Sequence, residues 1–190
     1  MSMESKLHIY NRMMATRDEL KVSEVEELGG QIQRRALGME EIRTALRVGL
    51  YAAFKNEVRT EQIFVEGDRH RKEIYFPAFD PEIGKLAYFR VMQLTDLLPT
   101  SEGFREPSSK QSKLRDINTL NVLVVPGVAF DIEGRRMGFG KGFYDECLRR
   151  FRGKRVALAY EFQVVSQLPT AVRERVLDWI VTEKRVIRCQ

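Results

Sequence analysis

The chain has 190 residues, of which 43% are hydrophobic and 31% are charged, and its net charge is +5. These values are typical of a single soluble domain with a real core, and no apolar run is long enough to cross a bilayer. The first residues show no signal-peptide pattern, so we expect a cytoplasmic protein without a membrane partner. The positive charge favours an anionic partner: nucleic acid, a nucleotide or an acidic metabolite. Because basic and acidic residues are interspersed, it indicates ordinary surface charge rather than a nucleic-acid face.

Cysteine and histidine are too few and too scattered for the commonest metal or triad sites. The two cysteines, Cys147 and Cys189, form no spaced pair, and the two histidines, His8 and His70, lie far apart. A zinc site or a serine–histidine triad is therefore poorly supported. Cys147 falls in a predicted helix, where we expect a buried free thiol.

The first part of the chain predicts two helices. Residues 3–20 carry apolar side chains at near-helical spacing, at Leu7, Tyr10, Met13, Met14 and Leu20. Ser23, followed three residues later by Glu26, has the pattern of a capping box and predicts a second helix through about Leu37. Gly38 is a plausible stop for it.

The next segments alternate between strands, a helix and a long polar region. Short apolar runs predict three strands, over residues 45–54, 72–79 and 85–91. Thr60 is placed to cap a helix between the first two of them, and residues 80–84 form the turn between the last two. Residues 95–118 are polar and contain prolines and serines, so they are predicted to be a loop.

The last third gives the clearest prediction of fold class. Residues 121–127 are an unbroken apolar run, typical of a strand that is covered on both faces. A glycine-bearing connection, a helix and two further strand regions follow, over residues 127–142, 142–151, 155–160 and 176–187. Strands that alternate with helices predict an α/β fold of three layers, with a mostly parallel central sheet and helices on both faces. We expect one domain over residues 1–190.

Three glycines alternate with other residues in that connection, at Gly138, Gly140 and Gly142. Ligands of α/β proteins bind where loops leave the carboxyl ends of strands, and glycines let a ligand approach the backbone closely. Amides of such a loop and of the next helix favour phosphate, and Lys141, Arg135 and Arg136 add positive charge. The spacing fits neither the Walker nor the Rossmann pattern, so the loop is either a phosphate site or a structural turn.

Two aspartates are candidate ligands for magnesium beside such a phosphate. Asp145 lies in the first turn of the predicted helix, where a carboxylate is either a partner of the helix dipole or a metal ligand. Asp178, near the start of the last strand region, is the natural second acid, although its spacing alone favours a solvated residue at a strand end.

The stretch over residues 124–148 resembles the signature of the 5-formyltetrahydrofolate cyclo-ligase family, also called methenyltetrahydrofolate synthetases. The signature joins a strand ending in Pro-Gly, then Phe-Asp, then an Arg-Leu-Gly-x-Gly-x-Gly-Tyr-Tyr-Asp run. The match is specific because three separately spaced elements agree. Four further segments resemble the family, over residues 50–63, 73–79, 103–107 and 176–187.

The resemblance implies an enzyme that uses ATP and Mg²⁺ to cyclise 5-formyltetrahydrofolate to 5,10-methenyltetrahydrofolate, releasing ADP and phosphate. The γ-phosphoryl group would activate the formyl oxygen, and the neighbouring aryl-amine nitrogen would then attack the activated carbon. Such chemistry asks mainly for positioning and charge neutralisation. The implied partners are a reduced folate and ATP, nucleic acid is not expected, and the protein is expected to be a monomer.

The resemblance also implies roles for particular residues. The ATP-binding positions would be Arg12, Arg136, Gly138, Phe139, Gly140, Lys141, Gly142, Phe143 and Tyr144. Lys141 and Arg136 would be catalytic, and the folate would contact Phe143 and Tyr144. Glu57 would bind the amino and ring nitrogens of the pterin, although its spacing alone assigns it no function. The magnesium-associated acids would be Asp145 and Asp178.

The sequence departs from the family pattern at three positions. The lysine of the amino-terminal Lys-x-x-Leu-Arg pattern falls near His8, with Lys6 slightly upstream. Phe143 replaces a tyrosine, which keeps the aromatic wall and loses a hydroxyl, and Met137 replaces a leucine of similar volume.

The alternative function is a catalytically inactive family member that binds folate, nucleotide or RNA as a regulator.

Overall fold

The computed structural model describes residues 5–108, 110–140, 142–169 and 176–189. Across these ranges the main sheet has seven strands. Their order across the sheet is β12 (Val186–Arg188), β11 (Trp179–Val181), β9 (Lys154–Leu158), β6 (Val122–Val125), β1 (Arg47–Gly49), β2 (Glu73–Asp80) and β3 (Lys85–Arg90). Neighbouring strands are parallel except in the two outermost pairs, so the prediction of a mostly parallel sheet is confirmed.

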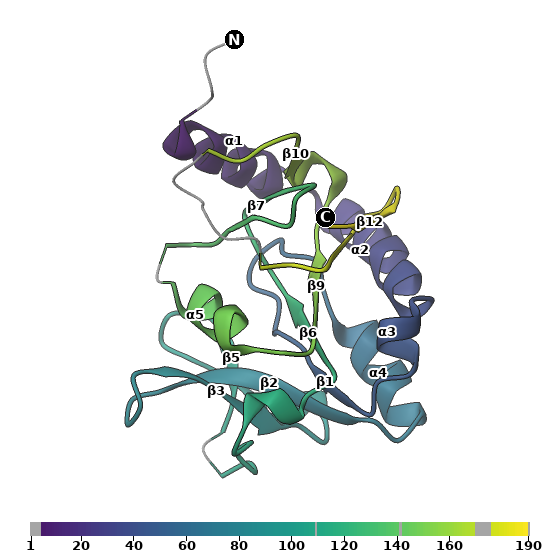
Figure 1. The fold of residues 1–190 in the computed structure, drawn as a ribbon, viewed down its shortest axis with the longest axis vertical. Helices are drawn as coiled ribbons and strands as arrows, with labels where there is room; N and C mark the ends of the chain where they lie inside the picture. The colour runs from purple at the N-terminus through teal and green to yellow at the C-terminus, as the bar shows by residue number, and fades with distance from the viewer. Residues whose placement is uncertain (1–4, 109, 141, 170–175, 190) are drawn as a thin grey trace.

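Helices cover both faces of this sheet (Figure 1). One face carries α2 (Val22–Leu37), α3 (Glu40–Arg43) and α4 (Glu61–Arg69), and the other carries α5 (Phe143–Arg150). Successive residues of a strand point to opposite faces. Val124 accordingly packs in the cluster beneath α2 and α4, whereas Val125 packs in the cluster beneath α5. The predicted three-layer α/β fold is therefore confirmed.

The amino-terminal helix α1 (Lys6–Asp18) packs outside the main sheet, against a small sheet made of β10 (Val164–Val165), β7 (Ala129–Asp131) and β8 (Arg136–Met137). Its buried face consists of Ile9, Met13 and Arg17, which are spaced four residues apart. Leu7, which the sequence places in the apolar stripe, is exposed. The helix was predicted, but its buried face was only partly identified.

Two predicted boundaries shift for local reasons. The α2 helix begins at Val22 rather than at the predicted Ser23 cap, because the Glu24 carboxylate accepts a hydrogen bond of 2.8 Å from the Lys21 amide. The strand predicted over residues 45–54 is only β1, since the chain leaves the sheet after Gly49.

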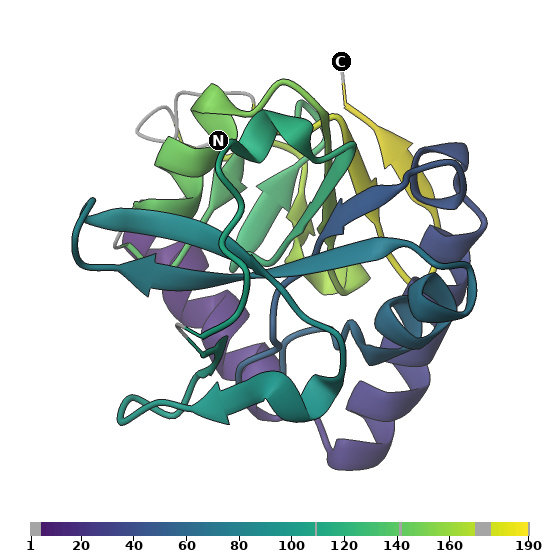
Figure 2. The ribbon, with the colours of Figure 1, turned by 90° about the horizontal axis from the view of Figure 1, so that it is seen from below.

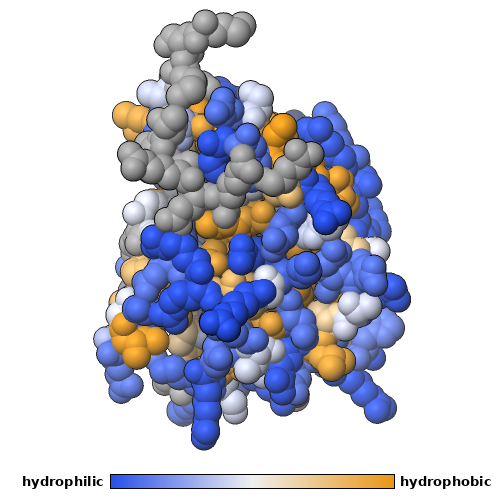
Figure 3. Space-filling view, in the orientation of Figure 1, coloured by the Kyte–Doolittle hydropathy of each residue, from blue (hydrophilic) through white to orange (hydrophobic). Residues whose placement is uncertain are grey.

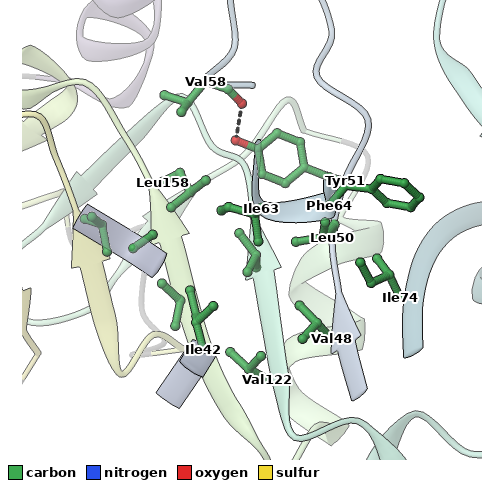
Figure 4. Packing of buried hydrophobic residues seen from close by; sticks show 14 of the residues in the cluster. Ile42, Val48, Leu50, Tyr51, Val58, Ile63, Phe64, Ile74, Val122 and Leu158 are labelled. Atoms are coloured by element: carbon green, nitrogen blue, oxygen red, sulfur yellow. Dashed lines mark hydrogen bonds between the residues drawn. The ribbon is translucent and has the colours of Figure 1, made fainter. Parts of the chain in front are cut away.

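The segment that follows β1 is held by buried hydrogen bonds rather than by strand pairing. The Tyr51 hydroxyl donates to the Val58 carbonyl at 2.6 Å, as Figure 4 shows among the surrounding core residues. Thr60 Oγ1 donates to the Tyr51 carbonyl at 2.7 Å. These bonds fix the shape of the loop that carries Glu57, which lies between them in the sequence.

The polar region predicted as a loop contains regular structure. It forms two short 3₁₀ helices, η1 (Leu94–Asp96) and η2 (Ile117–Thr119), and a hairpin of β4 (Leu97–Pro99) and β5 (Arg105–Pro107). A third 3₁₀ helix, η3 (Glu161–Gln163), precedes β10. In Figure 2 the hairpin lies beside β2 and β3, and β5 packs against β2. No described helix is both long and apolar enough to pass through a membrane.

Candidate active site

A cleft of about 630 Å³ opens where β1 and β6 end, which is the predicted position for a ligand in an α/β fold. Its walls come from the segment after β1, the β2–β3 hairpin, the β4–β5 hairpin, Pro126 and the connection from β8 to α5. Its volume lies within the range of small-molecule sites. Segments far apart in the sequence therefore meet around one ligand-sized space.

The glycine connection forms one wall of this cleft. Gly140 and Gly142 have φ angles of +104° and +73°, in the region that favours glycine, and a side chain added at either would point into open space. Gly142 directly precedes α5, whose first amides have no partner within the helix. Bare backbone and a helix amino end thus face the cleft together, an arrangement that favours an anion such as phosphate.

Arg136 joins the two ends of this wall. Its side chain is 3% exposed. Its Nε donates to the Pro126 carbonyl at 2.6 Å and its Nη1 to Asp145 Oδ1 at 2.7 Å, while its guanidinium lies 5.2 Å from the Tyr144 ring centre. Gly138 packs directly on the guanidinium, since an added Cβ would lie 2.8 Å from Nη1. Arg136 therefore braces the glycine connection and places positive charge behind it.

Glu57 brings a buried carboxylate to the same cleft. Its side chain is 5% exposed, and its Oε2 accepts a 2.9 Å hydrogen bond from the Phe54 amide. Burial raises the pKa of Glu57, and the Phe54 amide and the charges of Arg17 and Arg136 offset this only in part. A carboxylate held in this way can accept hydrogen bonds from the N–H groups of a ligand.

Aromatic rings supply flat apolar walls. Phe54 and Phe104 lie 4.3 Å apart between ring centres, and Phe79 and Phe143 lie 5.1 Å apart. All four line the cleft together with Tyr144, whose pKa burial raises well above its ordinary value. The Tyr144 hydroxyl therefore stays protonated at neutral pH. Such a cleft suits a planar heterocycle or an aromatic ring.

Asp145 is the described residue best placed to hold a divalent cation in this cleft. It lies in the first turn of α5, its side chain is 42% exposed, and it already pairs with Arg136. In the described part of the chain no group of three or more His, Cys, Asp and Glu side chains could hold a metal ion. Magnesium that is bound to nucleotide needs only one or two carboxylates besides phosphate oxygens, so Asp145 fits that ion.

The comparison with known proteins agrees with this geometry. A model of the 5-formyltetrahydrofolate cyclo-ligase family matches residues 2–183. The chain belongs to this family. The glycine connection and the buried Glu57 both lie within the matched range.

Curated cyclo-ligases and a solved structure are similar over nearly the whole chain. The 5-formyltetrahydrofolate cyclo-ligase of Haemophilus influenzae is 29% identical over 174 residues, covering 90% of this chain and 93% of its own. The Escherichia coli enzyme of the same name is 28% identical over 174 residues and is covered to 96%. The NMR structure of Aquifex aeolicus 5,10-methenyltetrahydrofolate synthetase matches with a TM-score of 0.85 and 31% identity, covering 97% of this chain and 93% of that one.

Most residues that the cyclo-ligase resemblance implicates meet at the cleft. Its lining includes Glu57, Arg136, Gly138, Phe139, Gly140, Gly142, Phe143, Tyr144 and Asp145. Lys141, the other expected catalytic residue, lies outside the described residues. Arg12 does not line the cleft, because it lies on the exposed side of α1.

Asp178 is not brought to Asp145. It precedes β11, where its carboxylate accepts a 2.8 Å hydrogen bond from the Arg155 amide and its carbonyl accepts one from the Cys189 amide. This is the amino end of a parallel strand, whereas the cleft lies at the carboxyl ends. The geometry therefore does not support the predicted pair of metal ligands, and Asp178 caps a strand instead.

Arg17 is a residue at this site that the sequence analysis missed. Its guanidinium lies 3.8 Å from the Glu57 carboxylate and 5.2 Å from the ring centre of Phe139. The signal that could have found it is its place on α1, because it continues the buried face of Ile9 and Met13 at four-residue spacing. A charged residue at such a position is rare unless it is paired.

Proposed function

We propose that this chain is an ATP- and Mg²⁺-dependent 5-formyltetrahydrofolate cyclo-ligase, which forms 5,10-methenyltetrahydrofolate and releases ADP and phosphate. The observation that carries the proposal is that one cleft joins a buried carboxylate, aromatic walls and a glycine wall before a helix amino end. The reaction needs a pterin and a triphosphate side by side, and the family match supports this assignment.

In this mechanism Glu57 accepts hydrogen bonds from the amino and ring nitrogens of the pterin. The aromatic walls hold the folate rings so that the formyl oxygen meets the γ-phosphoryl group. The amides of the glycine connection and the positive charge of Arg136 stabilise the phosphates. Phosphoryl transfer then activates the formyl group, and the aryl-amine nitrogen closes the ring as phosphate leaves. The protein mainly orients the two substrates.

The charges around the cleft favour a metal ion with the nucleotide. Four acidic side chains are among the described residues that line it, against two arginines, and they are Glu57, Glu102, Glu106 and Asp145. A triphosphate entering this space would be repelled unless a cation came with it. Magnesium bound by Asp145 and the phosphates would neutralise that charge during transfer.

The test is an absorbance assay with purified protein, ATP, Mg²⁺ and 5-formyltetrahydrofolate. We expect the methenyl absorbance to rise and ADP to appear in equal amount, and we expect neither when ATP is left out. Glu57→Gln should raise the KM for the folate by at least about tenfold, because a buried charged hydrogen-bond acceptor is lost. Binding of folate or nucleotide without any turnover would instead support the alternative function, an inactive regulator.

A further inference from the structure

Arg17 is a charged side chain in an environment that normally excludes charge. It is 1% exposed and stands first among the largest fully buried side chains of the described residues. Its neighbours on the same face of α1 are Ile9 and Met13. Burying a cation is costly unless other groups compensate it, so the groups around Arg17 indicate its purpose.

Those groups belong to two different walls of the cleft. Nη1 lies 3.8 Å from Oε1 of Glu57, an ion pair longer than a hydrogen bond, and the guanidinium lies over the Phe139 ring. Nη2 makes only a weak contact of 3.5 Å with Met14 Sδ. Within the described structure Nε and Nη1 have no hydrogen-bond partner. The guanidinium is therefore held by charge and by a ring face rather than by a completed hydrogen-bond set.

The backbone of Arg17 is tied to the same loop. The side-chain amide of Asn56 donates to the carbonyls of Arg17 and Leu20, at 2.9 and 3.1 Å. Because Asn56 directly precedes Glu57, the end of α1 and the carboxylate are fixed relative to each other. The ion pair is thus supported by backbone contacts that fix α1 against the loop of the cleft that carries Glu57.

We propose that Arg17 is a positioning residue of this cleft, which holds the Glu57 carboxylate and packs on the ring of Phe139 in the glycine connection. The inference deepens the proposed function and rests on it for the part that Glu57 plays toward the folate. Arg17 itself does not line the cleft, so it would act on the ligand through these two neighbours.

Other titratable groups also act on Glu57. Arg136, from β8, is the second positive charge that lowers its pKa, after Arg17. In the described part of the chain, three tyrosines also interact with Glu57: Tyr51, Tyr144 and Tyr160. Burial raises their pKa values, so they stay neutral at physiological pH. Among the described residues, Arg17 is therefore one of two cations that lower the pKa of Glu57 against the effect of burial, and only Arg136 of the two also pairs with Asp145.

The test compares Arg17→Met, Arg17→Lys, Glu57→Gln and the double variant Arg17→Met/Glu57→Gln. Calorimetric binding of 5-formyltetrahydrofolate without ATP should weaken about tenfold in Arg17→Met, and Arg17→Lys should regain part of that loss. In the Glu57→Gln background, Arg17→Met should change the affinity little. Arg69→Met, which removes an exposed arginine of α4, is the matched control and should bind as the wild type does.

A second measurement needs no ligand. The side-chain carboxyl carbon of Glu57, followed by NMR, should titrate at higher pH in Arg17→Met than in the wild type. The inference would be overturned if Glu57 titrated at the same pH in the wild type and in Arg17→Met. It would also be overturned if Arg17→Met lowered the folate affinity equally in the wild-type and the Glu57→Gln backgrounds. If Arg17→Met does not fold, Arg17→Gln replaces it. A wild type that binds no folate would refute the proposed function, and the titration would still decide whether Arg17 acts on Glu57.

Discussion

At the scale of single residues, backbone groups hold the buried charged side chains of Glu57 and Arg136 in place at the cleft. The Phe54 amide donates to Glu57, and Arg136 donates to the Pro126 carbonyl. The contact of Arg136 joins residues that no spacing rule connects, since Pro126 follows β6 and Arg136 lies in β8 of the small sheet. The sequence therefore indicates Glu57 only through the family resemblance.

The raised pKa of Glu57 predicts how stability depends on pH. In the folded state Glu57 binds its proton more readily than in the unfolded chain, because burial disfavours the carboxylate. Ionising it therefore opposes folding, so its contribution to stability is present at low pH and is lost as the pH rises through the folded-state pKa. We expect the unfolding free energy of the wild type minus that of Glu57→Gln to fall over this range.

Urea unfolding of both proteins at a series of pH values measures this difference. Using a difference removes the contributions of the other titrating groups and any constant effect of leaving Arg17 without its carboxylate. A difference that stays flat, or that rises with pH, would contradict the raised pKa.

At the scale of elements, the strand, connection and helix around the glycines were predictable because each has its own signal. The unbroken apolar run marks β6, and alternating glycines before an amphipathic segment mark the start of α5. The pairing of β7 with β8 inside the connection was not predicted. The strands β7 and β8 have three and two residues, which are too few to show a period in the sequence. Their pairing depends on hydrogen bonds such as the one that the Val128 amide donates to the Met137 carbonyl.

Gly142 allows a prediction at this scale with a matched control. Both Gly142 and Gly84 have positive φ angles, +73° and +65°, and open space around an added Cβ. Alanine at either position should lower the unfolding free energy by about 1–2 kcal/mol through backbone strain alone. Only Gly142→Ala should also weaken ATP binding, because only Gly142 lines the cleft.

Thermal unfolding and calorimetric titration with Mg²⁺–ATP distinguish these effects. Equal ATP affinity in the two alanine variants, with equal losses of stability, would place the phosphates away from this turn. A loss of affinity in Gly84→Ala would show that strain acts on the site from a distance.

At the scale of the whole molecule, the layered fold follows from residues that the sequence displays. Alternate residues of β6 face opposite helical layers, so both faces of the strand are covered and its apolar run is unbroken. The meeting of the β4–β5 hairpin with the segment after β1 is not visible in this way. Phe54 and Phe104 pack together at the cleft although neither lies in a periodic segment.

The surface predicts the oligomeric state. The face seen in Figure 3 is largely hydrophilic, and its apolar residues form small, separated patches. The large exposed apolar side chains come from many elements, for example Leu7, Leu46, Ile83 and Met92. Scattered residues of this kind are normal on monomers. We expect light scattering after gel filtration to give the mass of one chain, and a concentration-dependent dimer would contradict this.

The last turn of helix α1 contacts Glu57 and Phe139, and the helix packs on β7. All of these residues follow α1 in the sequence, so they are translated after the helix. During synthesis, α1 therefore cannot complete its packing until the glycine connection has left the ribosome. Its helical propensity alone would hold it only weakly in the meantime. Completion of the cleft is therefore expected to be a late event in folding, in which a helix translated early is among the last elements to dock.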